Sequence, residues 1–211
     1  MDRYSKILEE IWKYERENLK QEIKKSGIPL WLDLKIKKTI DRMFLDKKYE
    51  PIIKETLIND DVLLSFLMKD PKRQNIYENI FKNELIKEEF DVQKLKASGP
   101  EAHYLLNDQI VHNIKNKPKE LKSLDFVIHQ NNKKIYVVNK YTNEPGGAQD
   151  NQYNDVIIQL KNLGIKTVNS VWFCLDGKYY TKQKIDILKE INRNAIILNL
   201  DELIQKLKTI K

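Results

Sequence analysis

Two short apolar runs lie side by side in the chain, each with one charged residue, and limit its fold most strongly. Residues 124–130 read LDFVIHQ and residues 133–141 read KKIYVVNKY, with Asn131 and Asn132 between them. Short apolar runs rich in valine, isoleucine and aromatic residues are typical of strands, and asparagine favours tight turns. The sequence therefore predicts an antiparallel hairpin with its turn at these asparagines.

Helices and further strands are predicted on both sides of this hairpin, within a domain over residues 70–211. The expected order is a helix over 70–90, a strand over 92–98, a hairpin over 99–114, the central hairpin, a helix over 148–164, a strand over 167–175, a helix over 181–191, a strand over 195–200 and a helix over 201–210. Hairpins are antiparallel, whereas a strand–helix–strand crossover joins parallel strands. We therefore expect an α/β fold with a mixed central sheet flanked by helices.

Residues 1–69 show helical periodicity and are predicted to form an N-terminal helical subdomain. The apolar positions of the first helix are Ile7, Ile11, Tyr14 and Leu19. Gly27 and Pro29 are expected to end it. Pro51 and the acidic segment 59–61 separate the next short helices, and Asn59 or Asp60 is a candidate cap for the last.

The composition fits an ordinary soluble chain that buries a core, with 41% hydrophobic and 33% charged residues. We find no signal-type stretch and no segment apolar enough to span a membrane. The single cysteine, Cys174, cannot form a disulfide within the chain, so a cytoplasmic location is expected. Its apolar neighbours predict a buried, unreactive thiol.

The net charge of +7 comes mostly from residues after position 90. Clustered lysines such as Lys115, Lys117 and Lys119 suit phosphate binding, although a lysine-rich solvated surface explains them equally well.

Asp125 and Lys140 are charged residues in otherwise apolar strands. With the turn at Asn131 and Asn132, Asp125 is expected opposite residues 138 to 140, so the two side chains can approach on one face. A carboxylate can hold a divalent metal, and an ammonium can orient water or offset charge on a phosphate oxygen. This combination suits phosphodiester hydrolysis.

The order of elements in this domain resembles that of the PD-(D/E)xK nuclease superfamily. A helix is followed by antiparallel strands that carry Asp125 and, at a strand end, Lys140, and then by a helix and a strand. The pieces DPKRQNIYE, KLKASGPEAHYL, KSLDF and NKYTNEPGGAQDNQYNDV resemble its type II restriction endonucleases, over roughly residues 70–175. The resemblance implies Mg²⁺ as cofactor, Asp125 as a metal ligand, Lys140 as the catalytic lysine and Glu78 as an auxiliary acid.

One position departs from the superfamily pattern. The second acidic residue normally precedes the lysine by two positions, where this chain has Val138. Asp150 or Asp155 on the following helix can replace it, and we favour Asp150. Asn139 is a second candidate, although it should point away from Lys140 unless a bulge intervenes. The third interpretation is an inactive site, and Glu101 remains a reserve ligand.

Each of these residues also has a purely structural interpretation. Asp125 can pair with a nearby lysine, Lys140 can extend into solvent from its strand end, and Glu78 can be an exposed helix residue. Asp150 can simply favour the helix dipole. The three histidines, His103, His112 and His129, share no metal-ligand spacing, and we interpret them as structural residues or phosphate contacts.

The segment after the second strand is rich in amides. Asn and Gln can bond adenine in the major groove, or phosphates, so this segment is a candidate DNA contact. The candidate nucleic-acid-binding residues are Gln149, Asn151, Gln152, Lys94, Lys96 and Ser98. Caps and core hydrogen bonds are the alternative role of the amides.

The sequence thus predicts a Mg²⁺-dependent, sequence-specific double-stranded DNA endonuclease of type II restriction kind. A palindromic target implies a homodimer, and a cognate DNA methyltransferase is expected in the same system. The alternatives are a catalytically inactive DNA-binding protein of the same fold and a structure-selective repair or junction nuclease.

Overall fold

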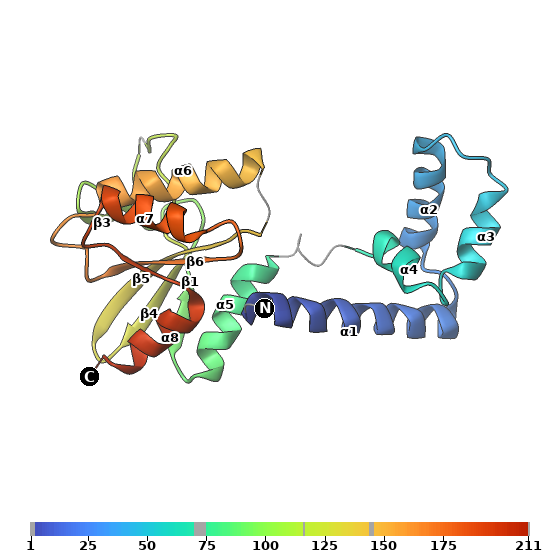
Figure 1. Ribbon diagram of the computed structural model, residues 1–211, viewed down its shortest axis with the longest axis horizontal. Coiled ribbons are helices and arrows are strands. Elements are labelled where there is room, and N and C mark those ends of the chain that lie inside the picture. Colours follow the sequence, from blue (N-terminus) through green and yellow to red (C-terminus); the bar gives the residue numbers. More distant parts are fainter. Residues whose placement is uncertain (1–2, 70–74, 116, 144–145, 211) are drawn as a thin grey trace. The chain divides into compact units, whose positions relative to one another are not determined.

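Among the described residues, strands begin only at position 91 (Figure 1). The computed structural model describes residues 3–69, 75–115, 117–143 and 146–210. Two compact units divide the chain, residues 1–76 and 77–211, so the division falls slightly after the predicted boundary at 69/70. Asp70 and Pro71, the predicted start of a helix, lie outside the described residues.

The first unit is helical, as predicted. Its helices are α1 (Arg3–Ser26), α2 (Leu30–Arg42), α3 (Tyr49–Thr56) and α4 (Asp61–Leu67). Its core includes the i, i+4 series Leu32, Ile36 and Ile40 of α2. The Asp60 carboxylate accepts hydrogen bonds from the backbone N–H groups of residues 62 and 63, which confirms it as the cap of α4.

Two details of this unit differ from the prediction. Tyr14 is 65% exposed, and the buried side chains of α1 are Tyr4, Leu8, Leu19 and Ile23. The apolar stripe of α1 is therefore shifted from the predicted one. Pro51 lies inside the first turn of α3 rather than before it. Proline is tolerated there because the first N–H groups of a helix have no intrahelical acceptor.

The second unit contains a five-stranded sheet in the order β1-β4-β5-β6-β7. Its strands are β1 (Asp91–Lys94), β4 (Phe126–Gln130), β5 (Lys133–Tyr141), β6 (Val171–Asp176) and β7 (Ile196–Leu198). The pairs β1·β4 and β4·β5 are antiparallel, whereas β5·β6 and β6·β7 are parallel. The predicted mixed sheet is confirmed, although β1 is shorter than the predicted strand over 92–98.

A separate hairpin forms between β1 and β4. Its strands are β2 (Tyr104–Leu106) and β3 (Gln109–Val111). Asn107 and Asp108 have positive φ of 48° and 58°, as the predicted two-residue turn requires. The Asp108 carboxylate accepts hydrogen bonds from Thr167 Oγ1 at 2.6 Å and from the N–H groups of residues 164, 166 and 167. The hairpin is thereby tied to the loop before β6.

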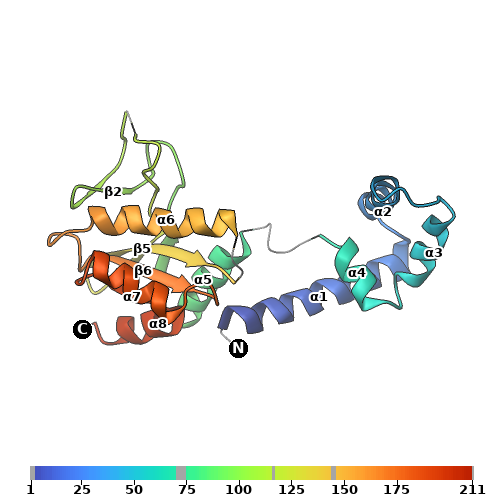
Figure 2. The same cartoon turned by 45° about the horizontal axis from the view of Figure 1, so that its top comes forward.

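Helices cover both faces of the sheet (Figures 1 and 2). These helices are α5 (Ile76–Lys87), α6 (Gly147–Asn162), α7 (Lys182–Ile191) and α8 (Leu200–Lys208). On one face, Val156 of α6 and Leu188 of α7 pack with Val138 and Phe173 of the sheet. On the other, the ring of Phe81 on α5 lies 4.6 Å from that of Phe126. The α/β class with helices on both faces is confirmed.

Cys174 is fully buried on β6, as predicted. Its Sγ lies 3.3 Å from Asp176 Oδ2, which also accepts the N–H of Leu200 at the start of α8. Burial, aided by the charge of Asp176, raises the pKa of the Cys174 thiol well above its ordinary value. The thiol therefore stays protonated at neutral pH.

Candidate active site

The β4–β5 hairpin sets the position of the candidate site. Asn131 and Asn132 have φ of 47° and 61°, which matches the twist of a tight two-residue turn. The register runs from Gln130 opposite Lys133 to Phe126 opposite Val137. Asp125 precedes β4, and its N–H donates to the carbonyl of Val137 at 2.9 Å.

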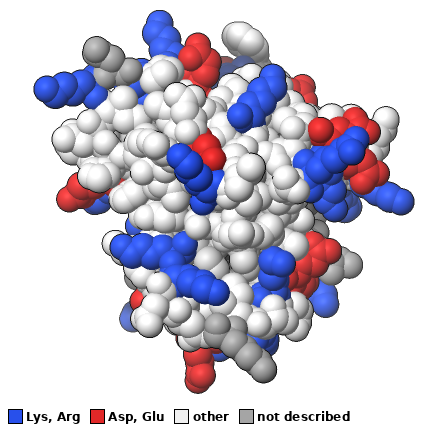
Figure 3. Space-filling view, turned by 90° about the vertical axis from the view of Figure 1, so that its left-hand side faces the viewer, with Lys and Arg blue, Asp and Glu red and all other residues white. Residues whose placement is uncertain are grey.

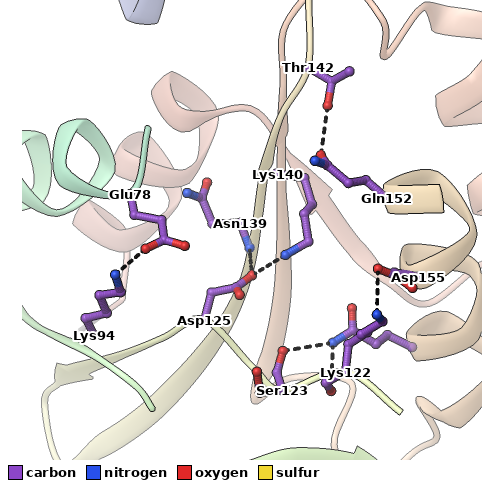
Figure 4. Close-up of polar contacts among 11 residues, drawn as sticks. Glu78, Lys94, Lys122, Ser123, Asp125, Asn139, Lys140, Thr142, Gln152 and Asp155 are labelled. Atoms are coloured by element: carbon purple, nitrogen blue, oxygen red, sulfur yellow. Dashed lines mark hydrogen bonds and ion pairs between the residues drawn. The ribbon is translucent and has the colours of Figure 1, made fainter. Parts of the chain in front are cut away.

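Asp125 and Lys140 form an ion pair where the two strands separate (Figure 4). Lys140 Nζ lies 2.8 Å from Asp125 Oδ2, and the backbone N–H of Asn139 donates to the same oxygen at 2.8 Å. Both charged side chains are 18% exposed. The ion pair is therefore mostly enclosed by protein, and part of it still reaches solvent.

The side chains of Asn139 and Lys140 leave β5 in different directions in Figure 4, as strand alternation predicts. Asn139 is 6% exposed, and its backbone N–H donates to Asp125. Val138, at the position of the missing acid, packs with Val156 and Leu160 of α6 in the apolar core. Position 138 therefore carries a buried apolar side chain where the superfamily pattern has a carboxylate.

The other predicted acidic residues have partners of their own. Glu78 on α5 forms an ion pair with Lys94 of β1. Asp150 on α6 accepts a hydrogen bond from the Tyr179 hydroxyl at 2.5 Å. The Oδ2 atom of Asp155 lies 3.7 Å from Lys122 Nζ. The structure brings together Asp125, Lys140 and the backbone of Asn139, and it does not bring Asp150 or Glu78 to this pair.

The side chains at this site offer few ligands for a metal ion. Within the described part of the chain, no three His, Cys, Asp or Glu side chains are grouped closely enough to hold one. At the Asp125 carboxylate the neighbouring charge is the Lys140 ammonium. Hard cations such as Mg²⁺ need several oxygen ligands, so these residues, as arranged, do not fit a resident Mg²⁺ site.

The predicted amide contacts divide into two groups. Gln152 accepts a hydrogen bond from Thr142 Oγ1 at 3.1 Å, which is a structural role at the end of β5. Gln149 is half-buried beside Gly146, and Asn151 is exposed on α6.

The lysines predicted to follow a DNA strand lie on and just after β1. Lys94 pairs with Glu78, and Lys96 and Ser98 are exposed. Figure 3 shows that Lys and Arg side chains on the face it presents stand at separate points with wide uncharged surface between them. On that face the net positive charge forms no continuous band.

A pocket of about 290 Å³ lies on the sheet beside the ion pair and was not predicted from the sequence. Its lining residues are Gln93, Lys94, Leu95, Lys96, Glu101, His103, Val127, His129, Lys134 and Tyr136. The period-two spacing of His129 with Val127 and of Lys134 with Tyr136 already places these four on one face of the hairpin. Glu101, the reserve ligand, lines this pocket with His103.

Comparisons with known proteins add no identification. No protein-family model matches the chain, and no curated protein or solved structure matches it at a significant level. Among the residues that the structure describes, no helix has the length and apolar character of a membrane span.

Proposed function

We propose that the chain is a DNA endonuclease of the PD-(D/E)xK superfamily, with Asp125 and Lys140 as its catalytic pair. The 2.8 Å ion pair between these side chains, at the adjacent ends of β4 and β5, is the observation that carries the proposal. The order α5, β1, β4, β5, α6, β6 agrees with it, because this is the order on which the resemblance to the superfamily rests.

The Lys140 ammonium is the group that acts on the phosphate in this proposal. A water oxygen attacks phosphorus and loses a proton to solvent, while the bond from phosphorus to the 3′ oxygen breaks. The 3′ oxygen takes a proton from solvent, so the products are a 3′-hydroxyl and a 5′-phosphate. Lys140 offsets the negative charge that develops on a phosphate oxygen, and Asp125 holds the ammonium in place. Because the residues as arranged do not fit a resident Mg²⁺ site, no step is assigned to a metal, and Mg²⁺ dependence stays a prediction from the resemblance.

The proposed endonuclease is of the type II restriction kind, which cleaves at a specific base sequence. It requires side chains that read bases, and exposed Asn151 on α6 and half-buried Gln149 are the candidates with suitable amide groups. A homodimer on a palindromic site and a partner methyltransferase belong to this part.

A DNA-binding protein without cleavage is the second candidate, and the surroundings of Val138 favour it. Val138 is fully buried in the core, while Asp150 and Glu78 are engaged with Tyr179 and Lys94. A chain that has lost its second acid would retain this fold and the Lys140 ammonium but would not turn over.

Digestion of a mixed-sequence plasmid tests the proposal. Wild type, Lys140→Ala and Asp150→Asn are compared with Mg²⁺, with Mn²⁺ and with EDTA, and Lys133→Gln, an exposed strand lysine, serves as control. Discrete fragments that disappear in Lys140→Ala but persist in the control support a restriction-type nuclease. An intact plasmid in both metals contradicts it and favours the second candidate.

Two further comparisons refine the result. Loss of cutting in Asp150→Asn would assign the second acid to α6, whereas survival would direct attention to Asn139 or Glu101. Ca²⁺ should tighten DNA binding by a metal-dependent nuclease and leave a non-catalytic binder unchanged.

A further inference from the structure

The pocket beside the ion pair lies on the same face of the sheet as Asp125 and Lys140. In the register of the hairpin, Val127 is opposite Tyr136 and His129 is opposite Lys134. Asp125 lies two positions before Val127, and cross-strand partners share a face. The floor of the pocket therefore continues along the strands from the candidate active site.

The wall of the pocket is cationic. Three lysines line it, Lys94, Lys96 and Lys134, and the one carboxylate among its lining residues is that of Glu101. Lys94 already pairs with Glu78, but Lys96 and Lys134 are exposed and have no acidic partner among the described residues. Two uncommitted ammonium groups at a concave surface are suited to bind a phosphate.

The pocket also offers aromatic rings. The ring centroids of His103 and Tyr136 lie 5.7 Å apart, with an angle of 35° between the ring planes. The ring centroid of His112 lies 5.8 Å from that of His103. His103 Nδ1 lies 3.0 Å from the carbonyl oxygen of Glu101. A carbonyl only accepts, so Nδ1 donates and Nε2 of the neutral ring remains available as an acceptor.

Size restricts the ligand. The volume of about 290 Å³ is near the lower limit of small-ligand pockets, roughly 300 Å³. Aromatic rings beside ammonium groups form the combination that binds single-stranded nucleic acid, with bases stacked on rings and phosphates near lysines. The pocket can hold one planar group with its phosphate.

We propose that this pocket binds one nucleotide, with its base against Tyr136 and His103 and its phosphate near Lys96 and Lys134. The choice of a DNA strand as the source of this nucleotide rests on the proposed function. The strand would pass from the pocket toward Lys140 along the hairpin. Since a base must leave its stack to enter, the pocket favours an unpaired nucleotide over a paired one.

Binding measured in EDTA tests the proposal without cleavage. Labelled single-stranded and duplex oligonucleotides are titrated by fluorescence anisotropy, and a deoxynucleoside 5′-monophosphate and inorganic phosphate serve as competitors. Lys134→Gln should weaken single-strand binding about tenfold. Lys133→Gln makes the same charge change on the opposite face of the strand, and it should weaken binding less than about twofold. Tyr136→Leu should weaken it about tenfold through lost stacking.

The outcomes separate the pocket from the nuclease proposal. Equal weakening by Lys134→Gln and Lys133→Gln would overturn the pocket, because charge alone would then explain binding. Competition by inorganic phosphate as effective as by the mononucleotide would also overturn it and leave only an anion site. Pocket-dependent binding of the mononucleotide without any binding of DNA would support the pocket with a free nucleotide as its ligand, and would count against the nuclease.

Discussion

Lys140 Nζ lies 2.8 Å from Asp125 Oδ2 across 15 positions of sequence, and the N–H of Asn139 bonds the same oxygen. The contact exists because the asparagine turn brings the two ends of the hairpin into register. The carboxylate receives a charged and a neutral donor at one oxygen, so it is held in one orientation. The ammonium is in turn fixed relative to the sheet.

The first prediction concerns the energetic coupling of this pair. Lys140→Met and Asp125→Asn should each lower the free energy of unfolding by about 1–3 kcal/mol, because each leaves a partly buried charge without its partner. The double variant should lose little more than the larger single loss. Urea denaturation at neutral pH measures all three, and losses that simply add would contradict the coupling.

Much of this arrangement was predictable from the sequence. The apolar runs in 124–130 and 133–141 and the asparagine turn between them predict the hairpin, and its register brings Asp125 to Lys140. The mixed sheet followed from the order of hairpins and crossovers. Both inferences depend on short-range patterns that strand geometry translates directly into position.

The partners of the helix residues were not predictable in this way. Glu78 and Asp150 have partners from β1 and from the segment after β6, and which ones they meet depends on how α5 and α6 pack on the sheet. The nucleotide pocket needs His103, which the segment after β1 carries back over the hairpin. Such long-range packing leaves no periodic signal.

The second prediction concerns Asp108, which accepts hydrogen bonds from Thr167 Oγ1 and from three backbone N–H groups. The Thr167 hydroxyl and the N–H of residue 166 lower the pKa of this carboxyl below its ordinary 3.8. Asp108→Asn should reduce the Tm by roughly 5 °C at neutral pH.

The difference between wild type and Asp108→Asn should depend on pH in a defined direction. A lowered folded-state pKa means that the stabilisation is complete above the unfolded value of 3.8 and is lost as the pH falls through the folded value. Thermal melts at several pH values should show a constant gap above about pH 5 that closes in stronger acid. A gap that widens on acidification would contradict this role.

The third prediction concerns the Cys174 thiol. It is fully buried, and burial beside Asp176 raises its pKa, so the reactive thiolate is scarce in the native protein. A thiol reagent such as DTNB should release almost no chromophore from the folded chain at pH 8 and one equivalent after denaturation. Rapid labelling of the native protein would show that β6 is accessible and would contradict the burial.

The fourth prediction concerns Gly177, which follows β6. Its φ is +97°, and a Cβ there would lie 2.2 Å from the carbonyl oxygen of Thr142, close to Lys140 in sequence. Gly177→Ala should cost about 2–4 kcal/mol of stability, because backbone cannot yield as a flexible side chain can. Gly147→Ala is the matched control, since a Cβ there meets nothing within 4 Å. Equal denaturation midpoints for the two variants would contradict the close approach.

The most direct test of the central claim is the rate of DNA cleavage by Asp125→Asn, Lys140→Ala and the double variant, beside wild type and Lys133→Gln. If the two side chains act as one catalytic unit, each single change should reduce the rate by about 100-fold or more, and the double change should cost little beyond either. Lys133→Gln should cleave like wild type. A Lys140→Ala variant that folds normally and cleaves DNA at the wild-type rate would contradict the claim.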